Sequence, residues 1–202
     1  MFQKGRERDD AAARVLPLDT DRPAVDAARR DPLRFDALYR KYVAQIYSFA
    51  LYETRNHHAA EDLTEQVFLQ AFRSLPTFNE LSDDERSTFR VWLFRIARNA
   101  LSNERRRERR HPQAPLELAF DAAAPDDPAA AVVARDEAAR AWRVVDRLPE
   151  ERRRALVLRF VEEMSAREIG QVLGRSEGAV RVLIHRALRS VADELGAGQR
   201  DP

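Results

Sequence analysis

The residues of this sequence best suited to chemistry are its arginines. Of the 35 basic residues, all except Lys4 and Lys41 are arginine. The arginine guanidinium group binds phosphates and guanine edges in bidentate geometry, although a GC-rich genome would also enrich arginine. Because 34 acidic residues bring the net charge to +1, only the distribution of the arginines along the chain can indicate a nucleic-acid partner.

One concentration of arginine is the stretch 98–111, RNALSNERRRERRH, which contains six arginines at the end of an apolar helical pattern. Dense cations of this kind suit a phosphate backbone. Asn99 and Asn103 are four residues apart and share a helical face, where their amides could pair with an unstacked base. The alternative is that the arginines only complement a helix dipole. Six arginines exceed that need, so we favour nucleic-acid binding.

A second concentration lies in residues 166–190, whose pattern predicts a helix-turn-helix motif. Ser165 and Glu168 form a capping box, Gly174 suits a left-handed helix end, and Ser176 can cap the following helix. The predicted inward positions of that helix are Val180, Leu183, Ile184, Ala187, Leu188 and Val191. Its outward face would then carry Glu177, Arg181, Val182, His185, Arg186 and Arg189, as a helix in the major groove requires. A solvated charged helix in a bundle is the alternative.

Acidic residues gather in the first turns of another predicted helix, at Glu61, Asp62 and Glu65. They could stabilise the helix N-terminus or form a patch for a basic partner. A metal site with His57 and His58 is disfavoured, because no further ligands stand at fixed spacing. The sequence also lacks a nucleophile elbow, a phosphate-binding loop and paired catalytic carboxylates. We therefore predict no catalytic residues, no metal, no cofactor and no enzymatic activity.

The elements that must position these residues are predicted to be helices throughout. Apolar residues recur at three- and four-residue spacing from Asp31 to Arg110 and again from Asp136, and only six glycines are present. The helices should break at 56–58 and at Leu75-Pro76, with a polar loop at 76–85. Residues 112–135 hold four prolines and four acids, which indicates a flexible acidic linker.

The expected organisation is therefore two small helical domains. It comprises a mostly disordered extension at 1–30, a first unit at 31–111, the linker at 112–135, a second unit at 136–195 and a tail at 196–202. The absence of cysteine permits a reducing cytoplasm. Neither a signal peptide nor an apolar run of membrane-spanning length is present, so we expect a cytoplasmic protein without membrane insertion.

The two units together resemble the extracytoplasmic-function (ECF) group of sigma-70-family RNA polymerase sigma factors. In the first unit the resemblance is carried by FDALYRKYVAQIYSFA, AEDLTEQVFLQAFRSLPTF and FRVWLFRIARNALSNERRRERR. In the second it is carried by LPEERRRALVLRFVEEMSAREIGQVLGRSEGAVRVLIHRALRSV. The order and spacing of the segments and the linker also match. The resemblance implies a transcription initiation factor that recognises and melts promoter DNA as a subunit of RNA polymerase.

The resemblance also implies roles for individual residues. Contacts with the basic β′ coiled coil of core polymerase fall on Asp62, Glu65, Gln66 and Phe68. Capture of a flipped base of the minus-ten element falls on Thr77, Phe78, Asn79, Asn99 and Asn103, and contacts with adjacent phosphates on Arg95, Arg98, Arg105, Arg106 and Arg107. The second unit would dock on the β flap and read the minus-thirty-five element with Ser176, Glu177, Arg181, Val182, His185, Arg186 and Arg189. An anti-sigma factor is a further expected partner.

Some residues depart from the family pattern. Val182 stands where serine is frequent in the family, Ala179 where threonine is common, and Ser165 where an aromatic residue is frequent. These departures leave the promoter sequence open. The alternative function is a stand-alone helix-turn-helix regulator that binds duplex operators as a dimer. A metal-dependent nuclease is disfavoured, because the metal ligands are missing.

Overall fold

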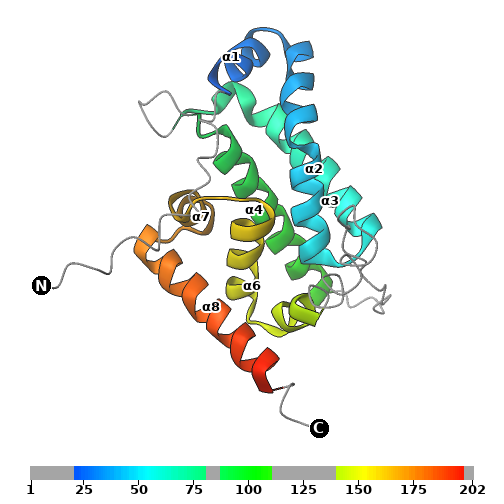
Figure 1. Ribbon diagram of the computed structural model, residues 1–202. Helices are drawn as coiled ribbons and strands as arrows, with labels where there is room; N and C mark the ends of the chain where they lie inside the picture. Colours follow the sequence, from blue (N-terminus) through cyan, green and yellow to red (C-terminus); the bar gives the residue numbers. More distant parts are fainter. Residues whose placement is uncertain (1–20, 81–86, 111–139, 198–202) are drawn as a thin grey trace, which may run out of the picture.

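The computed structural model describes residues 21–80, 87–110 and 140–197 (Figure 1). In the first unit the elements are α1 (Arg22–Arg30), η1 (Pro32–Arg34), α2 (Phe35–Thr54), α3 (His57–Ser74), η2 (Leu75–Thr77) and α4 (Phe89–Arg110). In the second unit, residues 140–147 are helical and are followed by α6 (Glu150–Leu156), a π-helical turn η3 (Val157–Val161), α7 (Ala166–Leu173) and α8 (Glu177–Ala197). Within these ranges no strand is present, and the prediction of an all-α fold is confirmed.

Helices α2 and α3 form a tight hairpin against which α4 packs. The chain reverses at Arg55, whose φ of 55° ends α2 in the left-handed region. Asn56 then begins α3, because its side chain accepts a hydrogen bond of 3.0 Å from the amide of Ala59. The core between the three helices is made of fully buried side chains, among them Leu38, Tyr42, Ile46, Phe49, Val67, Phe89, Leu93 and Phe94.

The N-terminal part of the chain corrects the expectation of a disordered extension up to residue 30. Residues 22–30 form α1, and its Val25 and Ala28 are buried against the first unit. Asp21, just before α1, is buried and binds both Lys41 and Tyr42 of α2. A helix as short as α1 has too few apolar residues for their spacing to predict it reliably. Its contacts with α2 stabilise it.

The second unit contains the predicted helix-turn-helix, formed by α7 and α8. Ser165 and Glu168 make the complete capping box, and Gly174 ends α7 with a φ of 69°. Gly170 faces the turn so closely that a Cβ atom there would lie 2.6 Å from the carbonyl oxygen of Arg175. The amide of Arg175 donates a 2.8 Å hydrogen bond back to Gly170. The turn therefore requires a residue without a side chain at position 170.

One expected inward position of α8 proves wrong. Leu188 was assigned to the buried side, but 45% of it is exposed. The buried side is carried by Val180 and Ala187, with Ile184 and Val191 partly covered. The second unit is small and covers α8 from one side only. Fewer apolar residues of this helix are therefore buried than its sequence pattern predicts.

The two units share one continuous core. Buried residues of the second unit, namely Val157, Leu158, Met164, Ile169 and Val172, belong to the same apolar cluster as the core of the α2–α4 hairpin. Figure 1 shows α4 lying between the α2–α3 hairpin on one side and α6 and α7 on the other, while α8 forms the outer layer. The predicted linker at 112–135, the tail beyond 197 and much of the 76–85 loop lie outside the described residues. None of the described helices has an apolar stretch long enough for a bilayer.

Candidate nucleic-acid interface

Helix α4 has an apolar inner face and a basic outer face. Its inner residues Leu93, Ala97 and Leu101 are buried in the core of the first unit. On the other side the side chains of Arg95, Asn99, Asn103, Arg106 and Arg107 are exposed. The two predicted amides and three of the predicted phosphate-binding arginines therefore share one accessible strip, which suits a single strand of nucleic acid.

Arg98, also predicted to bind phosphate, is not free at the surface. Its Nη1 donates a 2.8 Å hydrogen bond to the carbonyl oxygen of Val172 at the end of α7, and its Nη2 donates to Asn99 Oδ1 at 3.3 Å. Burial lowers the pKa of Arg98, and the nearby charges of Arg154 and Arg95 lower it further. Its guanidinium group therefore joins the two units in this structure.

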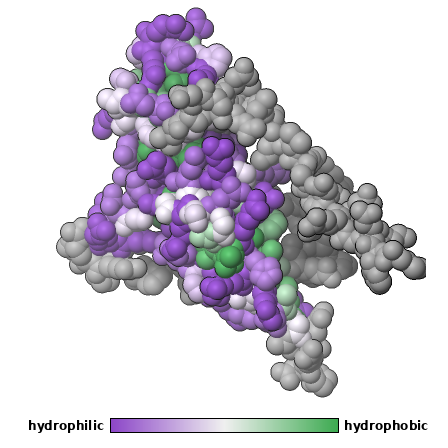
Figure 2. Space-filling view, turned by 90° about the vertical axis from the view of Figure 1, so that its left-hand side faces the viewer, coloured by the Kyte–Doolittle hydropathy of each residue, from purple (hydrophilic) through white to green (hydrophobic). Residues whose placement is uncertain are grey.

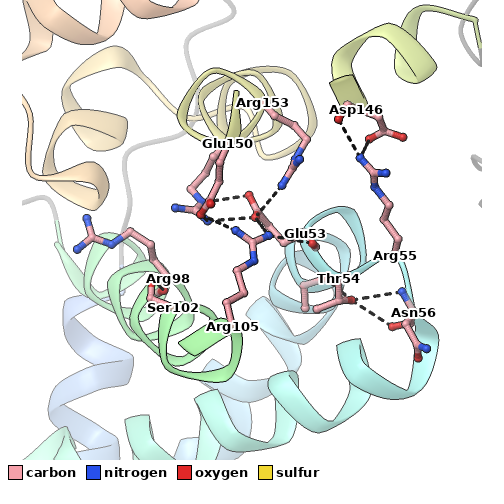
Figure 3. A network of polar contacts seen from close by, with 12 residues as sticks. Glu53, Thr54, Arg55, Asn56, Arg98, Ser102, Arg105, Asp146, Glu150 and Arg153 are labelled. Carbon is pink, nitrogen blue, oxygen red and sulfur yellow. Dashed lines mark hydrogen bonds and ion pairs between the residues drawn. The ribbon is translucent and has the colours of Figure 1, made fainter. Parts of the chain in front are cut away.

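Arg105 is likewise drawn into a cluster between the units, centred on Glu53 of α2 (Figure 3). The Glu53 side chain is fully buried. Arg105 Nη2 donates to Glu53 Oε2 at 2.8 Å, and Arg154 of α6 donates to both carboxylate oxygens at 3.0 and 3.1 Å. Arg153 lies 3.6 Å from the same carboxylate. Sequence reasoning missed Glu53, because nothing local distinguishes it from a solvated acid at a helix end.

Glu150 at the start of α6 completes this cluster. Its carboxylate pairs with Arg105 and accepts a 2.6 Å hydrogen bond from Arg154. Burial alone would raise the pKa of Glu150, but Arg105 and Arg154 outweigh burial and lower it. Burial likewise opposes the charge of Arg154, yet Glu53 and Glu150 raise its pKa. Removing one partner from such a buried set typically costs roughly 3–5 kcal/mol, because it leaves an uncompensated charge.

The predicted base-capture loop is divided between surface and core. Thr77 and Asn79 are exposed, whereas Phe78 is only 3% exposed and packs edge-on against Phe89 and beside Trp92. In this structure Phe78 therefore anchors the loop to α4 and contributes nothing to the exposed surface. The apolar neighbours that bury it belong to α4, which begins at Phe89, and the loop sequence does not reveal them.

The outer face of α8 is accessible along its first three turns. All the residues predicted to read the minus-thirty-five element are exposed, namely Ser176, Glu177, Arg181, Val182, His185, Arg186 and Arg189. The Ser176 side chain caps the helix by accepting from the amide of Ala179 at 3.2 Å. Glu177 pairs with Arg181 at 2.6 Å, an exposed contact worth little in water. Figure 2 views the side of α7 and the start of α8, where hydrophilic residues prevail around a small hydrophobic patch.

The acidic residues of α3 border an apolar groove between α2 and α3. Asp62, Glu65 and Gln66 are exposed, whereas Phe68 is buried and meets the Tyr39 ring at 4.8 Å. The groove is lined by Phe35, Tyr39, Val43, Ala44, Tyr47, Phe68, Leu69 and Phe72, with Glu61, Thr64 and Glu65 at its edge. Phe68 therefore packs beneath the exposed residues of the groove and is itself not accessible to a partner. Among the described residues no group of three or more histidines or acids could hold a metal ion.

Comparison with known proteins finds two family models, one for each helical unit. The family model "Sigma-70 region 2" matches residues 38–111, and "Sigma-70, region 4" matches residues 138–191. The ECF RNA polymerase sigma factor SigM of Mycobacterium tuberculosis H37Rv is 31% identical over 96% of this chain and 89% of its own length. SigE of Mycolicibacterium smegmatis is 34% identical over 80% of this chain, which spans 61% of that protein.

Among solved structures, CnrH in complex with the cytosolic domain of CnrY superposes with a TM-score of 0.64 at 26% identity. The match covers 89% of this chain and 99% of CnrH. The two family models fall on the two helical units in the order in which the sequence presents them. The chain therefore belongs to the ECF group of sigma-70-family RNA polymerase sigma factors.

Proposed function

We propose that this ECF sigma factor binds core RNA polymerase and divides promoter recognition between its two units. The first unit, residues 31–111, acts as sigma domain 2 and the second, residues 136–195, as sigma domain 4, joined by the acidic linker at 112–135. The chain contributes no catalysis of its own. It directs polymerase to promoters and stabilises the melted strand.

The observation that carries this proposal is the exposed strip on α4. Asn99 and Asn103 stand one helical turn apart among Arg95, Arg106 and Arg107, on a helix whose opposite face is buried. A helix embedded in this way cannot enter a groove of duplex DNA. It can hold a displaced strand, with the arginines on phosphates and the amides on an unstacked base. Thr77 and Asn79, in the loop that packs against the start of α4, would add to this base-capture surface.

The surface of α3 suits a basic, helical partner, which supports docking of the β′ coiled coil. Asp62, Glu65 and Gln66 supply charge and hydrogen bonds, while the adjacent groove offers exposed apolar area at Leu69 and Phe72. A hydrophobic centre with a charged rim is the usual composition of a protein interface. Opposite charges across this interface would also speed the encounter with polymerase.

The second unit reads the minus-thirty-five element and docks on the β flap. Its recognition helix α8 presents Arg181, Arg186 and Arg189 to the solvent. Arginine can donate two hydrogen bonds to a guanine edge in the major groove, and Val182 offers an apolar contact among these charges. The promoter sequence depends on which of these residues reach bases.

An anti-sigma factor is a further proposed partner. CnrH, a structural relative, was solved in complex with the cytosolic domain of CnrY, and a second neighbour of the same fold is described with the anti-sigma factor NepR. We expect this chain to act in the cytoplasm, where core polymerase transcribes DNA.

Transcription by core polymerase with and without this chain tests the proposal. Core enzyme and genomic DNA should yield a new set of 5′ ends only when the chain is added, and the regions upstream of those ends should share two elements. A stand-alone regulator would instead bind palindromic duplexes without polymerase and would create no new start sites. That outcome would overturn the assignment.

A further inference from the structure

We propose that helix α1 takes part in promoter recognition, because its Arg29 positions the turn that presents Thr77 and Asn79 to the melted strand. This base-capture turn, residues 75–79, consists of η2 and the two residues that follow it. The inference rests on the proposed function, since it names a further residue for strand capture. Arg29 acts through the base-capture turn and needs no contact with DNA, so it is a positioning residue.

The base-capture turn combines buried and exposed side chains. Leu75 and Phe78 are 2% and 3% exposed, whereas Thr77 and Asn79 are exposed. The amide of Phe78 donates a 3.1 Å hydrogen bond to the carbonyl oxygen of Leu75, which closes the turn. The two buried side chains therefore determine where the two exposed ones lie.

Phe78 places the base-capture turn at one end of the exposed strip of α4. Its ring packs beside Trp92, with the centroids 4.8 Å apart. Asn99 and Asn103 follow Trp92 by seven and eleven residues, so all three lie on one face of the helix. At 1.5 Å per residue, Asn99 is only about 10 Å further along the helix axis. A strand that lies on the amides of α4 can therefore reach the turn.

Arg29 contacts both buried residues of the base-capture turn. Its Nε donates a 3.3 Å hydrogen bond to the carbonyl oxygen of Leu75. Its Cζ lies over the ring of Phe78, 5.6 Å from the centroid, which is a cation–π geometry. The carbonyl oxygen of Leu75 also accepts from the amide of Phe78. Arg29 therefore meets the turn at the atom that closes it.

Helix α1 can hold the base-capture turn because it is itself fixed to the first unit, at the end where α4 begins (Figure 1). Val25 is buried against the core, and Asp21 binds Lys41 and Tyr42 of α2. Helix α1 also contacts η2 directly. The match to the region 2 family model begins within α2. The role proposed for Arg29 therefore lies outside the matched segment.

Glu80 fixes the chain at the other end of the base-capture turn. One of its carboxylate oxygens accepts a 2.8 Å hydrogen bond from the hydroxyl of Ser87, and the other accepts from the amide and the hydroxyl of Thr88. These donors precede α4, whose free amides and helix dipole favour a carboxylate. The turn is consequently held by α1 on one side and by the start of α4 on the other.

An anchored turn captures a base more tightly than a loose one. Ordering a flexible segment on binding consumes part of the interaction free energy, and fixing the segment beforehand removes that cost. Loss of Arg29 should therefore weaken the contact between the base-capture turn and a base. The contacts of the α4 arginines with phosphates should remain. Affinity for the base should consequently fall more than affinity for the backbone.

The alternative is that Arg29 only complements the dipole of α1. Arg29 and Arg30 both lie in the last helical turn of α1, and both are exposed. A dipole effect would be nearly equal for the two residues. Among the described residues, the contacts with the base-capture turn belong to Arg29. Arg30→Met is therefore the matched control for Arg29→Met, which keeps an unbranched side chain but removes the donor and the charge.

Binding of single-stranded oligonucleotides to the holoenzyme measures the positioning of the turn. The oligonucleotides carry the non-template minus-ten element, either intact or with one abasic site that is moved along the element position by position. In wild type at least one abasic site should weaken binding. The ratio of the two dissociation constants at that position reports base capture.

Arg29→Met should lower this abasic ratio at least about threefold, the effect of a turn that holds its competent arrangement a third of the time. Binding of the intact strand should weaken, binding of the abasic strand should hardly change, and Arg30→Met should behave as wild type. A variant that merely lowers the folded fraction weakens both oligonucleotides equally and leaves the ratio unchanged. Glu80→Gln, which removes the charge at the second anchor, should also lower the ratio.

A measurement on the free protein tests the anchoring without polymerase. The chain has two tryptophans, so Trp142→Phe leaves Trp92 as the only one. Trp92 packs beside Phe78, and a looser base-capture turn should uncover its ring. In this background Arg29→Met and Glu80→Gln should each raise the quenching of Trp92 fluorescence by acrylamide, whereas Arg30→Met should not.

Three results would overturn the inference. They are an abasic ratio in Arg29→Met equal to that of wild type, an equal loss in Arg30→Met, or unchanged quenching of Trp92 in Arg29→Met. Each of these leaves the assignment as a sigma factor that captures bases intact. Absence of any abasic effect in the wild-type holoenzyme would instead contradict strand capture in the proposed function, and the role of Arg29 would fall with it.

Discussion

Arg98 in α4 and Val172 in α7 are joined by a 2.8 Å hydrogen bond from the guanidinium Nη1 to the carbonyl oxygen. The bond connects a proposed contact of the minus-ten strand with the first helix of the helix-turn-helix. The accepting carbonyl lies in the last turn of α7, where helix carbonyls lack partners within the helix. Arg98 therefore satisfies a helix end where the two units pack together, and a phosphate that binds Nη1 must replace the carbonyl oxygen of Val172.

Charge reversal on α3 tests docking on polymerase. Asp62→Arg combined with Glu65→Arg should weaken binding to core enzyme at least roughly tenfold, because like charges would face the basic coiled coil. Both side chains are exposed, so helix content and thermal unfolding should stay near wild type. Reversal of two exposed acids on α8, Asp193 and Glu194, is the matched control. Co-elution with core polymerase that equals wild type would contradict the α3 assignment.

Asn99 tests strand capture. Asn99→Ala should impair open-complex formation by about 1–2 kcal/mol, the contribution of one base-edge contact, with core binding unchanged. Permanganate footprints on duplex promoters measure opening. A template mismatched across the bubble measures capture alone and should still show the loss, because the missing contact is to a base. Ser102→Ala, also exposed on α4, should behave as wild type, since its hydroxyl bonds to the carbonyl oxygen of Arg98. Equal losses in both variants would point to a structural role.

Val182 tests direct readout by the recognition helix. Half of this apolar side chain is exposed among charged neighbours, which suits contact with a thymine methyl group. Replacing thymines of the minus-thirty-five element by uracil, one at a time, should weaken binding at one position by about 0.8 kcal/mol, or roughly fourfold. Val182→Ala should reduce that uracil effect, whereas Leu188→Ala should retain it. If uracil weakens binding at no position, Val182 does not read bases.

Gly170 tests the turn of the helix-turn-helix. Gly170→Ala places a Cβ atom 2.6 Å from a backbone carbonyl oxygen, and the resulting shift should cost about 1–3 kcal/mol of stability. Gly178→Ala is a control of opposite sign. No atom lies within 4 Å of its Cβ position, so the gain in helix propensity should stabilise α8 by about 0.5–1 kcal/mol. Thermal unfolding followed by circular dichroism distinguishes the two. A neutral Gly170→Ala would mean that the turn can rearrange.

Local features of this protein were predictable, whereas contacts between distant segments were not. The capping box of Ser165 and Glu168 and the left-handed Gly174 depend on neighbours within a few residues, and all three were predicted correctly. Glu53 and Arg154 are 101 residues apart, and no periodicity links them. The position of α1, the burial of Phe78 and the core shared by the two units also depend on contacts between distant segments, so they were not predicted. Sequence patterns located the candidate DNA-binding surfaces but gave no sign that the second unit engages Arg98 and Arg105.

The last prediction concerns pH and the interface residue Glu162. Its side chain is buried, and its Oε1 has no hydrogen-bond partner among the described residues. Burial raises its pKa to about 7, although the charge of Arg90 in α4 and a hydrogen bond with Ser48 of α2 oppose the shift. Burial raises the pKa of the phenol of Tyr52, also in α2, and the negative charges of Glu162 and Asp146 raise it further. Glu162 therefore takes up a proton near pH 7 in the folded protein and near pH 4.5 in the unfolded chain.

The sign of the effect follows from this difference. A carboxyl group whose pKa is raised in the folded state favours that state when protonated. Its stabilisation is complete below about pH 4.5 and is lost as the pH rises through about 7. Between pH 5.5 and 8.5 the free energy of unfolding should consequently fall by about 2 kcal/mol. Urea unfolding followed by tryptophan fluorescence is suitable, because Trp142 lies at the interface.

Glu162→Gln isolates the contribution of this carboxyl group from that of every other titratable group. Glutamine stays neutral and can keep the contacts with Arg90 and Ser48, so the variant should be at least as stable as wild type at pH 8.5 and lose most of the pH dependence. Groups other than Glu162 contribute equally to both proteins and cancel in the comparison. If the two stability curves remain parallel from pH 5.5 to 8.5, Glu162 does not titrate in this range, and the pH dependence of stability comes from other groups.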